Sequence, residues 1–407
     1  MNRTSKNIVF FVFVLFCAAG IGAMIFAISN RWIILNFPQL GQSKTAVLVP
    51  NHATHTKKNI TIHLPKKKNK TEEVAILISE KPEVNAHTIS TAWLAKINEE
   101  GLLEKETTIQ SATLTKDQQQ LLISFDRPPF NKQASIENKL AFLESLCKTL
   151  ATHIPTLRSV LWLVHHKPLI DYHFDCSIAW PITGFPELKK PLENHIPAPT
   201  LANKPHITIM LDPAGDAGNK GRLIEGTFER GITLQYAEKL KQELSKESGY
   251  RVVLTRFPGE SIEPLQNATF SNRLQADLFI SLNFFHTTHE PAAWYLYYYT
   301  THPTTDHWYK APSRWDSIHT IYHRHLPTTT SYITKLHQNL HKQLQSTCAL
   351  YAPRGIPLRP LVGLAMPAIA IEIGLPPGTS FEHLVDPLAE AIKNTIVKLT
   401  KDGTTNT

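Results

Sequence analysis

Cysteine is rare in this chain, with four residues in 407. Cys17 lies in an apolar N-terminal segment, and the others are far apart, without the short spacings typical of zinc-binding motifs. This distribution argues against a disulfide scaffold or a cysteine-bound metal centre. We therefore interpret the remaining three as small buried hydrophobic residues. They are Cys147, Cys176 and Cys348.

The chain also lacks a basic face interleaved with aromatic residues, so we expect no nucleic-acid partner. The net charge is +8, but much of it is local, because lysines crowd one short stretch. These lysines are Lys57, Lys58, Lys66, Lys67, Lys68 and Lys70. The stretch is compatible with contact to anionic lipid headgroups or cell-wall polymer, and we interpret it as a solvated tether. A hydrophobic content of 42% and a charged content of 19% are typical of a globular protein.

Long apolar runs are absent except over residues 8–28, which carry no charge. As a helix of about 30 Å, this segment can cross a bilayer once. Arg3 and Lys6 precede it, so the positive-inside rule predicts a cytoplasmic N-terminus and export of the chain beyond Asn30. A cleavable signal peptide would have a shorter apolar core, and Phe16 before Cys17 is too large for a lipoprotein cleavage site. We therefore predict a single-pass anchor in the cell membrane, with the C-terminal domains extracytoplasmic.

Composition and periodicity divide the rest of the chain into domains and connectors. We predict a transmembrane anchor over residues 1–30, a linker over 31–73, a small α+β domain over 74–182, a Pro- and Lys-rich linker over 183–204, and an α/β domain over 205–400. Strands and helices alternate in the last domain, which predicts a mostly parallel sheet flanked by helices. We expect the second linker to be the preferred protease site and residues 205–407 to fold alone.

The smaller domain has a recognisable order of elements. Periodicity predicts strands over 74–78, 119–125 and 159–164, and helices over 88–99 and 136–153, the second capped by Ser135. This order, with Asn98-Glu99-Glu100-Gly101-Leu102 and Ile123-Ser124-Phe125-Asp126, resembles the GerMN domain of sporulation and germination proteins. The resemblance implies a role in extracytoplasmic binding or assembly.

The larger domain carries acidic residues at the ends of predicted elements. A strand over 207–211 runs into Asp212-Pro213, Glu229 heads a helix, a strand over 278–283 ends in Asn283, and a strand over 368–374 contains Glu372. This ordered set resembles the zinc-dependent N-acetylmuramoyl-L-alanine amidases, which cut the bond between glycan and stem peptide in peptidoglycan. The resemblance implies peptidoglycan as partner, Glu229 as a metal ligand and Glu372 as the catalytic carboxylate.

Two of the expected zinc ligands are replaced. The family's first strand ends in Asp-Pro-Gly-His-Gly-Gly and its later strand in Ser-Ile-His, and the two histidines fall on Gly215 and Asn283. Glycine has no ligating group, and an amide oxygen is a poor substitute for imidazole toward zinc. The arginine expected downstream is also gone, with Ala268 in its place. Zinc, the family's cofactor, is therefore not expected to bind in the ordinary way, although restoring both histidines should raise zinc affinity because Glu229 is retained.

The sequence supports three hypotheses. The first is a membrane-anchored envelope protein whose amidase-like domain binds peptidoglycan, or a hydrolase, without cutting. The second is an active amidase with relocated metal ligands, for which Asp216, Asn283 and His286 are the candidates. The third is an envelope assembly or germination factor in which the GerMN-like domain carries the function. A histidine- and aromatic-rich insertion over 286–330 is interpreted as a loop beside the cleft mouth.

Overall fold

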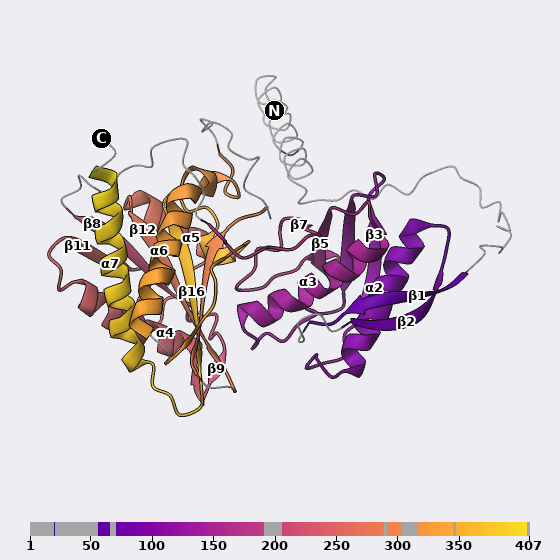
Figure 1. Ribbon diagram of the computed structural model, residues 1–407, viewed down its shortest axis with the longest axis horizontal. Helices are drawn as coiled ribbons and strands as arrows, with labels where there is room; N and C mark the ends of the chain where they lie inside the picture. The colour runs from indigo at the N-terminus through magenta and orange to yellow at the C-terminus, as the bar shows by residue number, and fades with distance from the viewer. Residues whose placement is uncertain are drawn as a thin grey trace, which may run out of the picture. The chain divides into compact units, whose positions relative to one another are not determined.

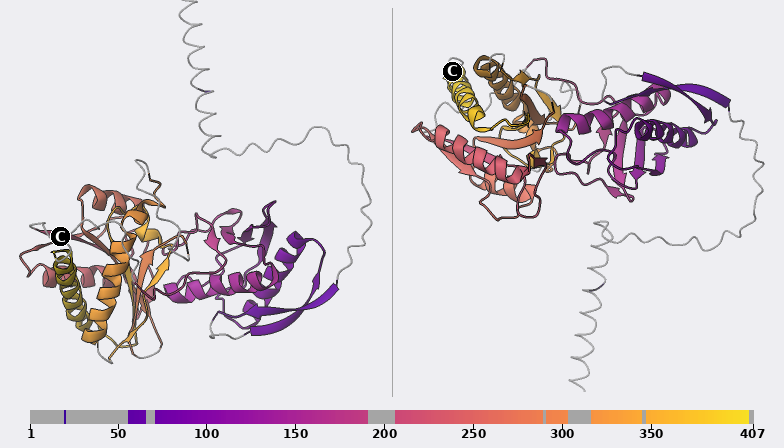
Figure 2. Two further views of the ribbon diagram at one scale, coloured as in Figure 1. Left: turned by 45° about the horizontal axis from the view of Figure 1, so that its top comes forward. Right: turned by 90° about the horizontal axis from the view of Figure 1, so that it is seen from below.

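The computed structural model of the protein describes residue 20 and residues 56–65, 71–190, 206–288, 291–302, 316–344 and 347–404. We call residues 56–190 the N-terminal domain and residues 206–404 the C-terminal domain. Figure 1 labels many of their helices and strands, and Figure 2 shows them from two further sides. Among the described residues, no helix is both long and apolar enough to cross a membrane. The predicted anchor lies outside them, apart from Gly20.

The N-terminal domain is of α+β type, as predicted. Strands β3, β4, β5 and β6 form one sheet with β7 paired to β5, and β1 and β2 form a separate antiparallel hairpin. Helix α3 and strand β5 have the predicted bounds, whereas β3 was not expected. The elements are β1 Thr56–His63, β2 Thr71–Ile78, α2 Pro82–Glu99, β3 Ile109–Leu114, β4 Gln120–Phe125, α3 Ile136–His153, β5 Ser159–Val164, β6 Lys167–Pro168 and β7 Trp180–Pro181.

The predicted linker over 31–73 is wrong for residues 56–63 and 71–73, which are strand. Ile60 and Ile62 alternate on one side of β1 and are fully buried. The backbone N–H of Thr61 lies 3.1 Å from Nε2 of His153 at the end of α3. The lysines on either side of this short apolar alternation obscured it in the sequence. The lysine pair of the stretch that we interpreted as a tether, Lys57 and Lys58, therefore lies on a folded strand.

The second predicted linker, 183–204, is also ordered at its beginning. Phe185 is buried, and its N–H donates to Oε1 of Glu144 at 3.0 Å. The N–H of Leu188 donates to the carbonyl of Pro353 in the C-terminal domain at 2.7 Å. Residues 183–190 therefore pack as part of the fold, because Phe185 has an apolar site to fill. Residues 191–205 lie outside the described part.

The C-terminal domain confirms the predicted α/β class. Its main sheet has the strand order β11-β8-β12-β16-β13-β14, with β15 paired to β13. Strands β11, β8, β12 and β16 are parallel, and β13 runs antiparallel to β16. The elements are β8 Ile207–Pro213, β9 Leu223–Ile224, β10 Thr227–Phe228, α4 Glu229–Leu244, β11 Tyr250–Leu254, α5 Pro264–Arg273, β12 Leu278–His286, β13 Ala293–Tyr299, α6 Leu326–Leu344, β14 Ala349–Leu350, β15 Arg354–Ile356, β16 Ala368–Leu375 and α7 Val385–Thr404.

The two faces of this sheet bury different partners, because side chains alternate along each strand. One face packs Ile280 and Ile371 against α4, α6 and α7, and Figure 1 shows α6 and α7 side by side. The other face contributes Met210, Phe279 and Ala370 to a hydrophobic cluster that continues into the N-terminal domain. Cys147 and Cys176 are buried in that cluster, as predicted. The two domains thus share one core, and residues 54–407 form one compact unit.

Candidate functional site

The sheet face toward the N-terminal domain carries the polar residues that the sequence singled out. Glu372 on β16 and Asn283 on β12 are register partners, and Ser281, two residues earlier on β12, pairs with Asp212 of β8. All four are buried, and Glu372 has no exposed surface. Parallel strands bring their carboxyl ends to one edge, which explains why residues so distant in sequence meet here.

Glu229 is the first residue of α4, where a carboxylate interacts favourably with the helix dipole. It is 1% exposed. Its Oε1 accepts from the N–H of Phe284 at 2.9 Å, and its Oε2 accepts from the N–H of Arg222 at 3.0 Å. Two backbone donors thus hold this carboxylate beside strand β12, close to Glu372.

Arg222, which the sequence did not point to, lies between these two carboxylates. Its Nη2 is 2.7 Å from Oε1 of Glu372, and its Nη1 is 3.8 Å from Oε1 of Glu229. Nη1 also donates to the carbonyl of Phe284 at 2.9 Å. Gly221 makes this turn possible: its φ is +70°, and a Cβ there would lie 2.8 Å from the Cβ of Glu229. A lone arginine in a loop gives no sequence signal for such a position.

The N-terminal domain completes the surroundings of Glu372. The N–H of Ile136, the first residue of α3, donates to Oε1 at 2.9 Å and to Oε2 at 3.1 Å. This N–H has no partner within its own helix, so a carboxylate is a natural acceptor for it. The hydroxyl of Tyr297 lies 3.5 Å from Oε2. Each of these partners of the carboxylate is a donor supplied by the protein itself.

A second group of charges joins Arg222 from the N-terminal domain. Nη2 of Arg222 donates to Nε2 of His173 at 2.8 Å, and Nζ of Lys139 lies 3.1 Å from Nδ1 of the same ring. Lys139 also forms an ion pair with Asp171 at 2.8 Å. Because a guanidinium only donates, Nε2 of His173 is the acceptor of this bond. The buried charges thus form one continuous network across the two domains.

The protonation of the network is set by burial and by its charges. Burial raises the pKa of Glu372, and Arg222 and the Ile136 N–H oppose that rise. Burial lowers the pKa of Arg222, but Glu229 and Glu372 more than offset this, so its pKa is raised. Burial, with the positive charges of Arg222 and Lys139, lowers the pKa of His173 to about 4. We therefore treat Arg222 as charged and His173 as neutral near pH 7.

These residues do not fit a zinc ion. The two carboxylates that would face it are bound to a guanidinium, and no group of three or more His, Cys, Asp or Glu side chains in the described residues is arranged to hold a metal. Gly215 has φ +76°, and a Cβ there would lie 2.7 Å from the Cβ of Arg230. The expectation that histidines at 215 and 283 would raise zinc affinity is therefore revised, because the loop does not accept a side chain at 215 as it stands.

The candidate replacement ligands are dispersed. Oδ1 of Asp216 accepts from the N–H groups of Gly218 and Asn219 within its own loop, at 2.6 and 2.7 Å. Nδ2 of Asn283 lies 3.5 Å from Oγ of Ser281, and His286 is exposed at the end of β12. In the part that the structure describes, these side chains do not form a metal-binding group with Glu229.

Part of the histidine-rich insertion packs on the N-terminal domain. Nδ1 of His319 is 3.0 Å from Oδ2 of Asp175, and the hydroxyl of Tyr299 donates to the same oxygen at 3.1 Å. Tyr299 and Tyr322 stack edge to face. Residues 303–315, which include Trp308, Tyr309 and Trp315, lie outside the described residues.

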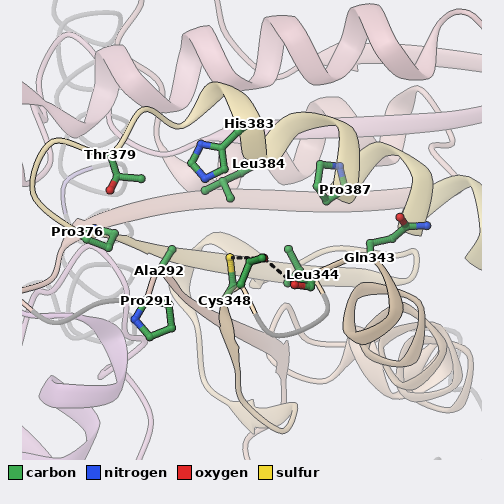
Figure 3. Close-up of a pocket in the computed structure, with 11 residues that line it drawn as sticks. Pro291, Ala292, Gln343, Leu344, Cys348, Pro376, Thr379, His383, Leu384 and Pro387 are labelled. Carbon is green, nitrogen blue, oxygen red and sulfur yellow. Dashed lines mark hydrogen bonds between the residues drawn. The ribbon is translucent and has the colours of Figure 1, made fainter.

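A separate cavity of about 580 Å³ lies beyond the end of β16. Pro376 and His383 line one side, and Pro291 and Cys348 line the other (Figure 3). Arg222, Glu229 and Glu372 do not line it. This cavity is therefore distinct from the charge network.

Part of the C-terminal domain is similar to a known protein family. Residues 209–398 match the family model of N-acetylmuramoyl-L-alanine amidase. Among solved structures, the chain is similar to the catalytic domain of the amidase CwlV from Bacillus (Paenibacillus) polymyxa var. colistinus, with 17% identity, 48% of this chain and 98% of that chain covered, and a TM-score of 0.36.

Two amidases from Clostridioides difficile give comparable results. One, from strain 630, has 19% identity, covers 49% of this chain and 98% of its own, and has a TM-score of 0.36. The other is the CwlD amidase in complex with the GerS lipoprotein, with 15% identity and a TM-score of 0.30. That match covers 49% of this chain and 98% of the CwlD chain. No curated protein matches the sequence. Over residues 209–398, the chain is therefore similar to the N-acetylmuramoyl-L-alanine amidase family.

Proposed function

We propose that this protein is a membrane-anchored, extracytoplasmic envelope protein whose amidase domain binds peptidoglycan, or an envelope hydrolase, without cutting the amide bond. The family match supports the cell wall as the setting. The uncharged segment over residues 8–28, preceded by Arg3 and Lys6, supports the anchor and the export of the domains.

The observation that carries the non-hydrolytic part is the ion pair of 2.7 Å between Arg222 and Glu372. Amide hydrolysis by a metal-bound water needs a carboxylate that can reach that water and accept its proton. Glu372 has no exposed surface, and its oxygens accept from the guanidinium and from the N–H of Ile136. A water at this carboxylate would have to displace a charged partner in a buried site, which is costly.

The test compares the purified full chain with an amidase that retains its complete His–Glu–His ligand set. We expect substoichiometric zinc by metal analysis, no release of stem peptide from labelled sacculi, and co-sedimentation of the chain with sacculi or with an envelope hydrolase. The reference amidase should hold zinc and release peptide under the same conditions.

An active amidase with relocated ligands predicts the opposite result. In that case the unmodified chain would hold one zinc ion and release stem peptide, and Asp216→Asn or His286→Gln would abolish both. A third outcome is a chain that holds no zinc, releases no stem peptide and associates with neither sacculi nor a hydrolase. That result would favour the assembly or germination role of the GerMN-like domain.

A further inference from the structure

The contact between α3 and Glu372 has consequences for the whole molecule. Ile136 begins a helix of the N-terminal domain, whereas Glu372 lies in the central sheet of the C-terminal domain, 236 positions later in the chain. Ser135 caps the helix by accepting from the N–H of Asn138 at 3.1 Å, which leaves the N–H of Ile136 free to point outward. The helix therefore presents this donor to a buried carboxylate of the other domain.

Further polar contacts between the domains surround this one. Arg222 binds His173 at 2.8 Å, and the N–H of Arg359 donates to the carbonyl of His173 at 2.7 Å. Arg354 pairs with Glu137, next to Ile136 in α3, at 3.0 Å. The contact of α3 with Glu372 is thus enclosed by bonds that also cross from one domain to the other.

We propose that the carboxylate site where the amidase family places its metal serves in this chain as an interdomain lock. Arg222 supplies the positive charge at this site, and the N-terminus of α3 occupies the space above Glu372. The buried pair of Glu372 and Arg222 joins the domains instead of acting on a substrate. The proposal does not depend on what the protein binds in the envelope.

Separation of the two domains would remove hydrogen-bond partners from the buried ion pair of Arg222 and Glu372. Ile136 would no longer donate to Glu372, and His173 would no longer accept from Arg222. Hydrogen bonds to charged groups are stronger than those between neutral groups, so the loss of these bonds opposes separation. The lock therefore holds the domains in one arrangement and keeps a glycan strand away from Glu372.

A matched pair of substitutions isolates the hydrogen bond. Ile136→Pro removes the N–H donated to Glu372, and proline is well tolerated at the first position of a helix. The preceding Ser135 has φ −58° and ψ 159°, which suits a residue before proline. Ile136→Ala shortens the same side chain but keeps the N–H, so it controls for lost packing.

The readout is the association of the two domains after the chain is cut between them. A specific protease site is inserted between Pro197 and Ala198 of the full chain in detergent, and the cut halves are diluted and separated by size exclusion. The two halves of the parent chain should co-elute, and so should those of Ile136→Ala. On dilution, the halves of Ile136→Pro should separate at a protein concentration at least about ten-fold higher than the halves of the parent do. Equal dissociation of the two variants would overturn the proposal.

A second substitution covers the case in which Ile136→Pro does not fold. Glu372→Gln keeps the size of the side chain but removes the charge that accepts from the N–H of Ile136, so the cut halves should again dissociate more readily. Glu382→Gln is the control, because Glu382 is an exposed residue that pairs with Lys239 of its own domain. Identical behaviour of these two variants would also contradict the lock.

Hydrolysis by the variants separates this inference from the proposed function. Release of stem peptide by Ile136→Pro but not by Ile136→Ala would support the lock, and would make α3 an inhibitor of a working enzyme. That result would overturn the non-hydrolytic function alone.

Discussion

Individual residues of the site differ in how far the sequence could predict them. Glu229 and Glu372 stood out because the residues around them resemble the amidase motifs, and the structure brings both to one buried network. Arg222 did not stand out, because the sequence around an arginine in a loop does not distinguish a solvated side chain from a buried one. Its position depends on the Gly221 turn and on acceptors from three separate elements, which only the tertiary structure assembles.

His319 provides a pH-dependent contact at the residue scale. Its hydrogen bond to Asp175 raises its pKa above the usual value of 6.5. Burial raises the pKa of Asp175, but the bonds from His319 and Ser177 outweigh this and lower it. A histidine with a raised pKa stabilises the fold fully below about pH 6.5, and the effect is lost as the pH rises through its folded-state pKa.

We therefore expect His319→Gln to lower the urea midpoint of the full chain near pH 6 and to have a smaller effect near pH 9. The measurement is urea unfolding of both proteins across this range. His286→Gln, at an exposed position at the end of β12, is the control and should show no such difference. A midpoint difference that is constant with pH would mean that the charge of His319 does not act through Asp175.

At the scale of elements, clear apolar patterns predicted the bounds of helices and strands well, whereas short strands with few apolar residues were missed. Helix α3 agrees with its predicted bounds because its apolar residues recur at helical spacing, and strand β5 agrees because it is a short continuous run of apolar residues. Strand β1 was missed because only two of its positions are apolar, and lysines precede them. Tertiary packing against α3, not the local pattern, makes that segment a strand.

The buried face of β1 allows a direct test of whether residues 56–63 form a folded strand. Ile60 has no exposed surface, so Ile60→Ala should cost about 2–5 kcal/mol of unfolding free energy through lost burial and a cavity. Lys58→Ala, on the exposed part of the same strand, should change it by less than about 0.5 kcal/mol. Urea unfolding of both variants measures the difference. Equal small effects would restore the interpretation of this segment as a linker.

For the whole molecule, the α/β class of the C-terminal domain was predictable from alternating strands and helices, but the relation between the domains was not. A proline-rich boundary suggested two independent folds. The structure instead has one hydrophobic cluster that includes Trp162 and Phe174 of the N-terminal domain with Met210 and Phe279 of the C-terminal sheet. Sequence patterns report that a strand face is apolar, but they do not say which element covers it.

This shared cluster changes the expectation for residues 205–407 expressed alone. Without the N-terminal domain, the sheet face with Met210, Phe279 and Ala370 would be open to water, and Glu372 would lose the Ile136 donor. We expect the fragment to bind a hydrophobic dye and to unfold in a broad transition, whereas the full chain unfolds in one sharp transition that reports residues 54–407 together. Calorimetry and dye fluorescence on both proteins measure this. A fragment that unfolds as sharply as the full chain, without dye binding, would show that the C-terminal domain needs no cover from its neighbour.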